Sequence, residues 1–218
     1  MKAIAINGSP RKTWNTATLL KKALEGAKSR GAETELINLY DLNYRGCISC
    51  FACKRKDSDK FVGHCAMKDD LTEVLEKVVS SDVLIMGSPI YLGNVTGQMR
   101  SFFERLIFMN LSYDEGKLNN FYGKINTGLI YTMNITQDAL DKLGYKYIFD
   151  TNERYMKLLN GESESLIVTD TYQFEDYDKY NASKFNEKHK AQIKAEQFPL
   201  DCERAFQMGE RLTGICNK

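Results

Sequence analysis

Short apolar runs along this chain alternate with longer stretches in which apolar residues recur every three to four positions. The runs predict strands buried within a sheet, and the recurring positions predict helices with one core-facing stripe. Because strands alternate with helices, the pattern predicts a parallel, doubly wound α/β sheet with right-handed crossovers. The strands are expected at residues 3–6, 34–39, 83–86, 127–131 and 166–169.

The expected helices are marked by capping residues and charge. Carboxylates at Asp69-Asp70 favour the positive end of a helix, and Thr96 is a capping residue. Residues 87–94 are rich in Gly, Pro and Asn and are predicted to form a loop. The helices are expected after Thr18, from Asp69-Asp70, after Thr96, within 137–159, and in a charged C-terminal helical segment around 175–212.

Composition limits the class of protein. A length of 218 residues predicts a single domain, residues 1–218, with a cysteine-containing insertion around 40–68. Lys plus Arg total 30 and Asp plus Glu total 29, without a long basic tract, so nucleic acid is not an expected partner. No stretch approaches the roughly 20 apolar residues of a membrane span, and no signal-peptide pattern opens the chain. We therefore expect a cytoplasmic protein without membrane association.

Polar loops follow the first, third and fourth predicted strands. Ligands of doubly wound sheets bind at the carboxyl ends of strands, where the strand order reverses. The first of these loops lies in IAINGSPRKTWNTAT, residues 4–18, and leads from a strand into a helix. A helix start favours an anion, and Ser9, Arg11, Asn15 and Thr16 add donors suited to a phosphate monoester.

An ordinary capped strand-to-helix turn remains the alternative for this loop. The sequence contains neither G-x-x-x-x-G-K-[ST] nor G-x-G-x-x-G, which disfavours ATP or GTP chemistry and the dinucleotide-binding fingerprint. A second loop, Ser88 to Asn94, follows the third strand, and its proline and glycine keep the backbone close to a flat ligand. Tyr91 is placed to cover an aromatic ring, although it would also suit a packed strand–helix connection.

Two paired motifs resemble the NADPH-dependent FMN reductase family, which includes the iron–sulfur flavoproteins. They are residues 6–11 with Asn15-Thr16, and residues 87–91 with 96–100. The resemblance implies a flavodoxin-like fold, with a doubly wound five-stranded parallel sheet in the order 2-1-3-4-5 and helices on both faces. Trp14 departs from the motif, because relatives often have glycine before Asn-Thr.

The resemblance also implies FMN as the cofactor. Its phosphate would be held by Ser9, Arg11, Asn15 and Thr16. Its ring would be lined or bordered by Pro89, Ile90, Tyr91, Gly93, Asn94, Tyr131, Thr132 and Met133.

The implied activity is that of an FMN-binding oxidoreductase, passing electrons from NAD(P)H to a quinone, flavin or other small acceptor. No catalytic side chain is singled out, which suits an enzyme whose cofactor carries the chemistry. One alternative is a flavin electron-transfer protein, with or without an iron–sulfur cluster, reduced by a ferredoxin-like partner. Another is a flavin-binding regulatory module without turnover. The resemblance and the aromatic residues between 102 and 122 predict a homodimer or homotetramer.

The cysteines leave several interpretations open. Cys47, Cys50 and Cys53 are three residues apart, and Cys65 follows only after a long, partly basic gap. In the iron–sulfur members of the resembled family the fourth cysteine comes sooner, which weighs against a four-iron cluster. Zinc bound by the cysteines, with or without His64, is a second option. On a helix this spacing would form one buried stripe, and we favour free or buried thiols over either metal.

Overall fold

Five parallel strands form the central sheet of the computed structural model, which describes residues 1–57 and 62–216. Their order is β2-β1-β3-β5-β6, and a short sixth strand, β4 (Asn94–Val95), pairs antiparallel with the end of β3. Counted along the chain, the parallel strands have the order 2-1-3-4-5, so the predicted fold class is confirmed. The strands are β1 (Lys2–Asn7), β2 (Glu33–Asn38), β3 (Val83–Tyr91), β5 (Ile125–Thr132) and β6 (Asn160–Val168).

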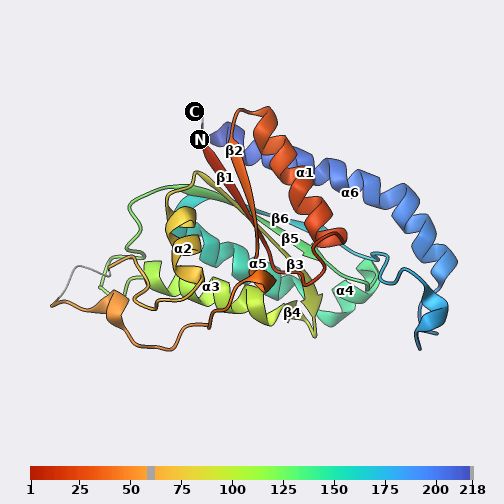
Figure 1. Cartoon of the computed structure of the whole chain (residues 1–218), viewed down its shortest axis with the longest axis horizontal. Coiled ribbons are helices and arrows are strands. Elements are labelled where there is room, and N and C mark those ends of the chain that lie inside the picture. Colours follow the sequence, from red (N-terminus) through yellow and green to blue (C-terminus); the bar gives the residue numbers. More distant parts are fainter. Residues whose placement is uncertain (58–61, 217–218) are drawn as a thin grey trace.

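Helices cover both faces of this sheet (Figure 1). Side chains alternate between the two faces along a strand. Ala3 and Ala5 of β1 therefore face one helical layer, while Ile4 and Ile6 face the other. One layer contains α1 (Asn15–Ser29) and α6 (Glu187–Ile215), and the other contains α2 (Leu71–Val79), α3 (Gly97–Asn110), α4 (Gln137–Leu143) and α5 (Lys146–Met156). Within the described residues, no helix combines the length and apolarity that a membrane crossing requires.

Two glycines allow α1 and α6 to cross in backbone contact. A Cβ atom built on Gly26 would lie 1.9 Å from the carbonyl oxygen of Phe206, and one on Gly209 would lie 1.8 Å from that of Ala23. Real Cβ atoms do not approach backbone so closely, so only glycine fits at these positions. The crossing holds α6 on the sheet and, with it, the segment that enters α6 from β6.

The prediction of a loop at residues 87–94 is wrong. β3 continues to Tyr91, because Gly87, Ser88 and Pro89 pair with the end of β5. The chain then turns through Leu92 and Gly93, which have φ angles of 51° and 82°, into β4. Two successive positive φ angles are typical of a tight hairpin. Gly87 and Pro89 are typical turn residues, but pairing with β5 keeps this segment extended.

Hydrogen bonds of two aspartates and a buried arginine close the base of the cysteine insertion. The carboxylate of Asp70 accepts a hydrogen bond from the backbone N–H of Asn43 at 2.7 Å. The buried guanidinium of Arg105 donates to the carboxylate of Asp69 at 2.5 Å and to the carbonyl of Arg45 at 3.3 Å. These contacts join the two ends of the insertion at the start of α2, where Asp69 also accepts from a helical N–H as its sequence position predicted.

The cysteines in this insertion do not form a helical stripe, so that interpretation is wrong. Cys53 lies in a short 3₁₀ turn (Ala52–Lys54), and Cys47 and Cys50 lie in irregular chain before it. Cys53 is buried, whereas Cys50 is exposed. The ammonium group of Lys54 donates to carbonyls at the end of α3, including that of Leu111 at 2.5 Å. A cation at a helix C-terminus is stabilised by the helix dipole, and this contact holds the insertion against α3.

Candidate functional site

The start of α1 lies at the carboxyl end of β1 and presents unpaired backbone N–H groups. Trp14 precedes the helix without a capping side-chain hydrogen bond, and the first turn contains no acidic residue. The first N–H groups of a helix have no intrahelical acceptor, and the dipole makes this end positive. The turn therefore has the polarity of an anion-binding site.

The chain before this helix is shaped by hydrogen bonds from buried side chains. The buried Asn7 accepts from the backbone N–H of Ser9 at 3.0 Å and donates to Asn38 at 2.9 Å. The Ser9 hydroxyl oxygen accepts from the backbone N–H of Arg11 at 3.1 Å, which leaves its O–H free to donate. The hydroxyl of Thr96 donates to the carbonyl of Gly8 at 2.7 Å while capping α3, so the first and third strand ends are joined.

A cavity of about 150 Å³ lies where these segments meet. We call it the flavin cavity, after the cofactor that the sequence resemblance implies. It brings together the ends of β1, β3 and β5, as the carboxyl-end rule predicts. The predicted site residues that line it are Ser9, Arg11, Asn15, Thr16, Pro89, Ile90, Tyr91, Thr132 and Met133.

Three predicted residues lie outside the cavity. Tyr131 is buried in the opposite layer, where its ring packs against Phe149 with 4.4 Å between centroids and its hydroxyl accepts from Asn152 at 3.2 Å. Burial raises the pKa of Tyr131 well above its ordinary value. Gly93 lies at the hairpin turn, and the exposed Asn94 accepts from the N–H of Val95. The structure does not bring these three residues together with residues 9–16, the segment from the end of β1 into α1 that we call the phosphate loop.

The structure adds a segment that sequence reasoning missed. Residues 170–180, here called the strap, follow the end of β6 and cross the phosphate loop. The guanidinium of Arg11 donates to the carbonyl of Gln173 at 2.5 Å, and Trp14 and Asn15 donate to the carbonyl of Tyr172 at 3.2 and 2.9 Å. The strap begins at the carboxyl end of a parallel strand, so applying the same rule to the fifth strand would have indicated it.

An ion-pair network anchors the base of the strap. The carboxylate of Asp170 pairs with the ammonium of Lys190 and lies 2.6 Å from the imidazole of His189, both on α6. Lys190 is 3% exposed and also donates to the carbonyl of Asn134 at 2.6 Å. The backbone N–H of Asp170 donates to Ile135 at 2.7 Å. The strap is thereby tied to the loop after β5 as well as to α6.

Asn134 provides a buried acceptor at the cavity wall. Its side-chain amide nitrogen donates to the side chain of Gln173 at 2.5 Å, while its side-chain oxygen, Oδ1, is buried without a hydrogen-bond partner among the described residues. A buried unpaired acceptor costs on the order of 1–3 kcal/mol, so a ligand with an N–H or O–H donor would complete this position. A flavin ring and its ribityl chain carry such donors.

A model of the NADPH-dependent FMN reductase family matches residues 1–136. The chain belongs to this family. The match includes the phosphate loop and the β3 segment that line the flavin cavity. The predicted family is thus confirmed, and the protein is a flavodoxin-like member of a family of FMN-using oxidoreductases.

The chain is also similar to individual curated proteins, which are iron–sulfur flavoproteins. An iron–sulfur flavoprotein of Methanocaldococcus jannaschii is 40% identical over 105 residues, which are 48% of this chain and 51% of that protein. One of Archaeoglobus fulgidus is 42% identical over 105 residues, 48% of either chain. The chain spans about half the length of the curated relatives it matches.

Solved structures share the fold. An NAD(P)H:quinone oxidoreductase from Methanothermobacter marburgensis superposes with a TM-score of 0.68 at 15% identity, covering 97% of this chain and 96% of that one. An FMN-dependent NADH-azoreductase from Bacillus anthracis, in complex with FMN, gives 0.65 at 13% identity, covering 98% and 100%. These likenesses establish the flavodoxin-like architecture.

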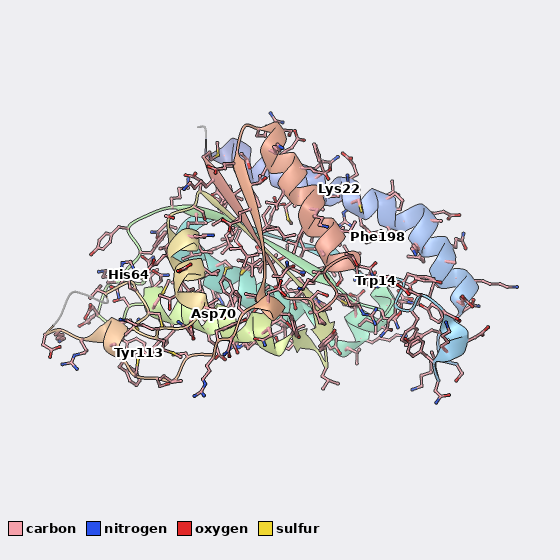
Figure 2. The ribbon with its side chains drawn as sticks, in the orientation of Figure 1. Trp14, Lys22, His64, Asp70, Tyr113 and Phe198 are labelled. Carbon is pink, nitrogen blue, oxygen red and sulfur yellow. The ribbon has the colours of Figure 1, made fainter. Side chains whose placement is uncertain are left out.

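The cysteine insertion of this family member lies away from the flavin cavity. Figure 2 shows His64 beside α2, far from Trp14 at the start of α1. In the described part of the chain, no three His, Cys, Asp or Glu side chains converge as metal ligands. As placed here, Cys47, Cys50, Cys53 and Cys65 therefore do not fit a cluster or a zinc ion, and no step of the mechanism involves one.

Proposed function

We propose that this protein is an FMN-dependent oxidoreductase that moves electrons from NAD(P)H to a small acceptor such as a quinone or a flavin. The proposal is carried by one cavity that combines an uncapped helix start with the buried Oδ1 of Asn134, an acceptor that has no partner in the described part of the chain. Bound FMN would supply the redox chemistry, as acceptor of a hydride from the reduced nicotinamide and donor of two electrons to the small acceptor, whose protons would come from water.

The phosphate end of the cofactor would meet the start of α1. Ser9 and Thr16 carry hydroxyls there, and Arg11 and Asn15 reach the same region from the loop. The last two now donate to strap carbonyls. Charge-assisted hydrogen bonds are roughly twice as strong as neutral ones, so a phosphate competes well with those carbonyls for Arg11. The strap would then exchange partners when FMN enters.

The ring end would meet a less polar wall. Pro89 and Ile90 supply apolar surface from β3, and Tyr91 is half-exposed at the cavity edge, where burial raises its pKa. Asn134 would accept a hydrogen bond from a ring or ribityl donor at its side-chain oxygen, Oδ1. A cavity of 150 Å³ is smaller than the roughly 300–1,000 Å³ typical of small-molecule sites. An outward shift of the strap would therefore accompany binding of the whole cofactor.

An exposed apolar edge beside the cavity supports a proposal about assembly. The hairpin tip at Leu92 is fully exposed beside the half-exposed Tyr91. Covering this apolar edge with a second copy would shield the cofactor, and we propose a homodimer or homotetramer in the cytoplasm.

Anaerobic stopped-flow spectroscopy tests the proposed function directly. FMN-saturated protein is mixed with NADPH or with NADH, and bleaching of the flavin absorbance is followed. We expect reduction by at least one of them, and a quinone should then restore the absorbance. If neither nucleotide reduces the flavin while a reduced ferredoxin does, the protein is an electron carrier and the proposed function is wrong.

A further inference from the structure

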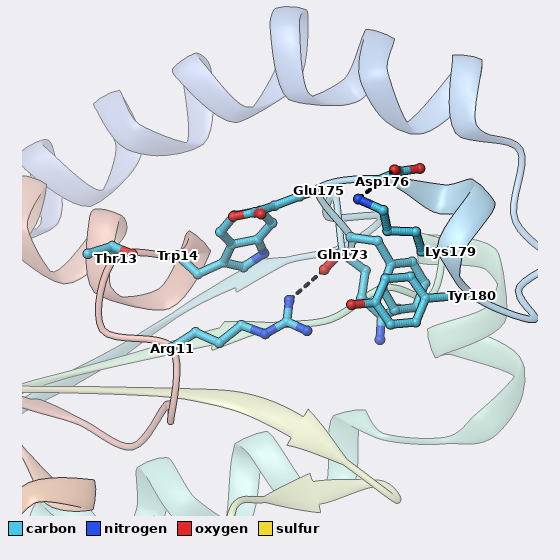
Figure 3. Close-up of a pocket in the computed structure, with 9 residues that line it drawn as sticks. Arg11, Thr13, Trp14, Gln173, Glu175, Asp176, Lys179 and Tyr180 are labelled. Carbon is cyan, nitrogen blue, oxygen red and sulfur yellow. Dashed lines mark hydrogen bonds and ion pairs between the residues drawn. The ribbon is translucent and has the colours of Figure 1, made fainter.

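A second cavity, of about 470 Å³, adjoins the flavin cavity (Figure 3). Arg11, Trp14 and Gln173 line both cavities, so the two are neighbours across the contact between the phosphate loop and the strap. The volume lies within the roughly 300–1,000 Å³ typical of small-molecule sites. We call this space the strap cavity, and the proposed FMN site does not occupy it.

Aromatic rings form two sides of the strap cavity. Figure 3 shows Trp14 on one side and Tyr180 on the other, with the guanidinium of Arg11 between them. Tyr180 stacks on Phe174, with 4.4 Å between ring centroids and 18° between planes, and is 55% exposed. The stack holds the tyrosine ring in place, and its exposure leaves it accessible to a flat ligand. Such walls suit a planar base, because every nucleobase has a π-face that can stack.

Charged groups complete the lining. Arg11 and Lys179 are cations, and Glu175 and Asp176 are carboxylates. Lys179 lies 3.1 Å from Asp176, with side chains 75% and 44% exposed, so this ion pair is weak and easily exchanged. Cations bind phosphate oxygens, and carboxylates accept hydrogen bonds from ribose hydroxyls, as they do in dinucleotide-binding proteins. The set of aromatic, cationic and acidic groups matches a nucleotide.

We propose that the strap cavity binds the adenosine-phosphate half of the nicotinamide dinucleotide. The adenine would stack on the exposed ring of Tyr180, the phosphates would meet Lys179 and Arg11, and the ribose hydroxyls would meet Glu175 or Asp176. This inference rests on the proposed function, because it assigns a place to the part of NAD(P)H that does not react. It also explains why the two cavities share a wall.

Binding of ADP-ribose, which lacks the nicotinamide and cannot reduce a flavin, tests the cavity alone. Trp14 is the single tryptophan of the chain, so its fluorescence reports on this wall. We expect saturable quenching in flavin-free protein and calorimetric binding to FMN-loaded protein. Tyr180→Ala and Lys179→Ala should each weaken binding roughly tenfold, the scale of one lost stacking or charged contact. Tyr122→Ala and Lys124→Ala, exposed residues before β5 at the other end of the sheet, are the controls.

Kinetics separate this inference from the proposed function. Tyr180→Ala should raise the half-saturating concentration of the dinucleotide relative to that of reduced nicotinamide mononucleotide by about tenfold. The inference is overturned if ADP-ribose fails to bind, if both cavity variants bind it like the controls, or if FMN displaces it. If neither NADH nor NADPH reduces the flavin while ADP-ribose binds as described, the proposed function fails and the adenosine-phosphate site stands.

Discussion

The guanidinium of Arg11 and the backbone carbonyl of Gln173 are joined by a hydrogen bond of 2.5 Å, although the residues are 162 positions apart. This contact lies on the wall between the flavin cavity and the strap cavity. Together with the bonds from Trp14 and Asn15 to Tyr172, it ties the strap to the phosphate loop, so that a displacement of one segment would move the other. Ligands in either cavity would therefore act on the same two segments.

Arg11→Ala should weaken FMN binding by about 1.5–3 kcal/mol, because a charge-assisted bond to the phosphate is lost. Riboflavin lacks the phosphate and should bind both proteins with similar affinity. Fluorescence titration of flavin-free protein measures both ligands, and Arg30→Ala, at the far end of α1, is the matched control. Equal losses for FMN and riboflavin would show that Arg11 acts on the fold of the loop instead. FMN should also raise the melting temperature of the parent protein by linkage.

Asn134→Ala should weaken FMN and riboflavin alike, by about 1 kcal/mol, since its acceptor would serve the ring or ribityl chain. The variant also loses the hydrogen bond to the side chain of Gln173. Gln173→Ala removes that same bond but keeps the acceptor, and is therefore the control. If both variants lose affinity equally, the effect comes from the strap and the acceptor has no direct role.

Gly209→Ala should destabilise the protein by about 1–3 kcal/mol through overpacking, because its Cβ would lie 1.8 Å from the carbonyl of Ala23. Gly214 lies in the same helix, and a Cβ atom added there by Gly214→Ala would have no atom within 4 Å. That change should stabilise the protein by about 0.5–1 kcal/mol, the ordinary helix preference for alanine. Urea unfolding measures both, and equal shifts would contradict the observed helix crossing.

Cys53 should react with iodoacetamide more slowly than the exposed Cys50, and raising the pH should speed its reaction. The thiolate is the reacting form, and burial raises the pKa of the Cys53 thiol. Cys50 is exposed and is expected to be alkylated first. Peptide mass spectrometry after timed alkylation across a pH series distinguishes the two sites. Reaction of Cys53 at the rate and pH of Cys50 would show that the insertion opens readily.

Iron and acid-labile sulfide should be substoichiometric after anaerobic purification. Cys47, Cys50, Cys53 and Cys65 do not converge in the described residues, and Cys65 follows its partners only after a long gap. Colorimetric iron and sulfide assays, normalised to amino-acid analysis, give the measurement. Four irons per chain would instead mean that the insertion rearranges around a cluster.

Local pattern was enough for much of the fold and for part of the site. Apolar runs and helical stripes are local properties, and they identified the parallel strands and the helix that follows each. The phosphate loop could be identified because its residues, from Ser9 to Thr16, are contiguous. Thr96 was likewise predicted as a helix cap, and it accepts from the N–H of Met99 at 3.2 Å.

Tertiary structure decided the rest, because the interactions concerned join distant segments. β3 extends through Gly87–Pro89 only because β5 supplies paired backbone groups beside it. Tyr131 lies away from the flavin cavity because its ring packs against Phe149 and its hydroxyl accepts from Asn152, both on α5, and residue type did not reveal these contacts. The strap crosses the phosphate loop because the α1–α6 crossing and the Asp170–Lys190 ion pair hold it there. Residue patterns within a single segment contain no record of such long-range contacts. They are enough to predict the helices and strands, whereas packing between distant segments sets how those elements enclose the site.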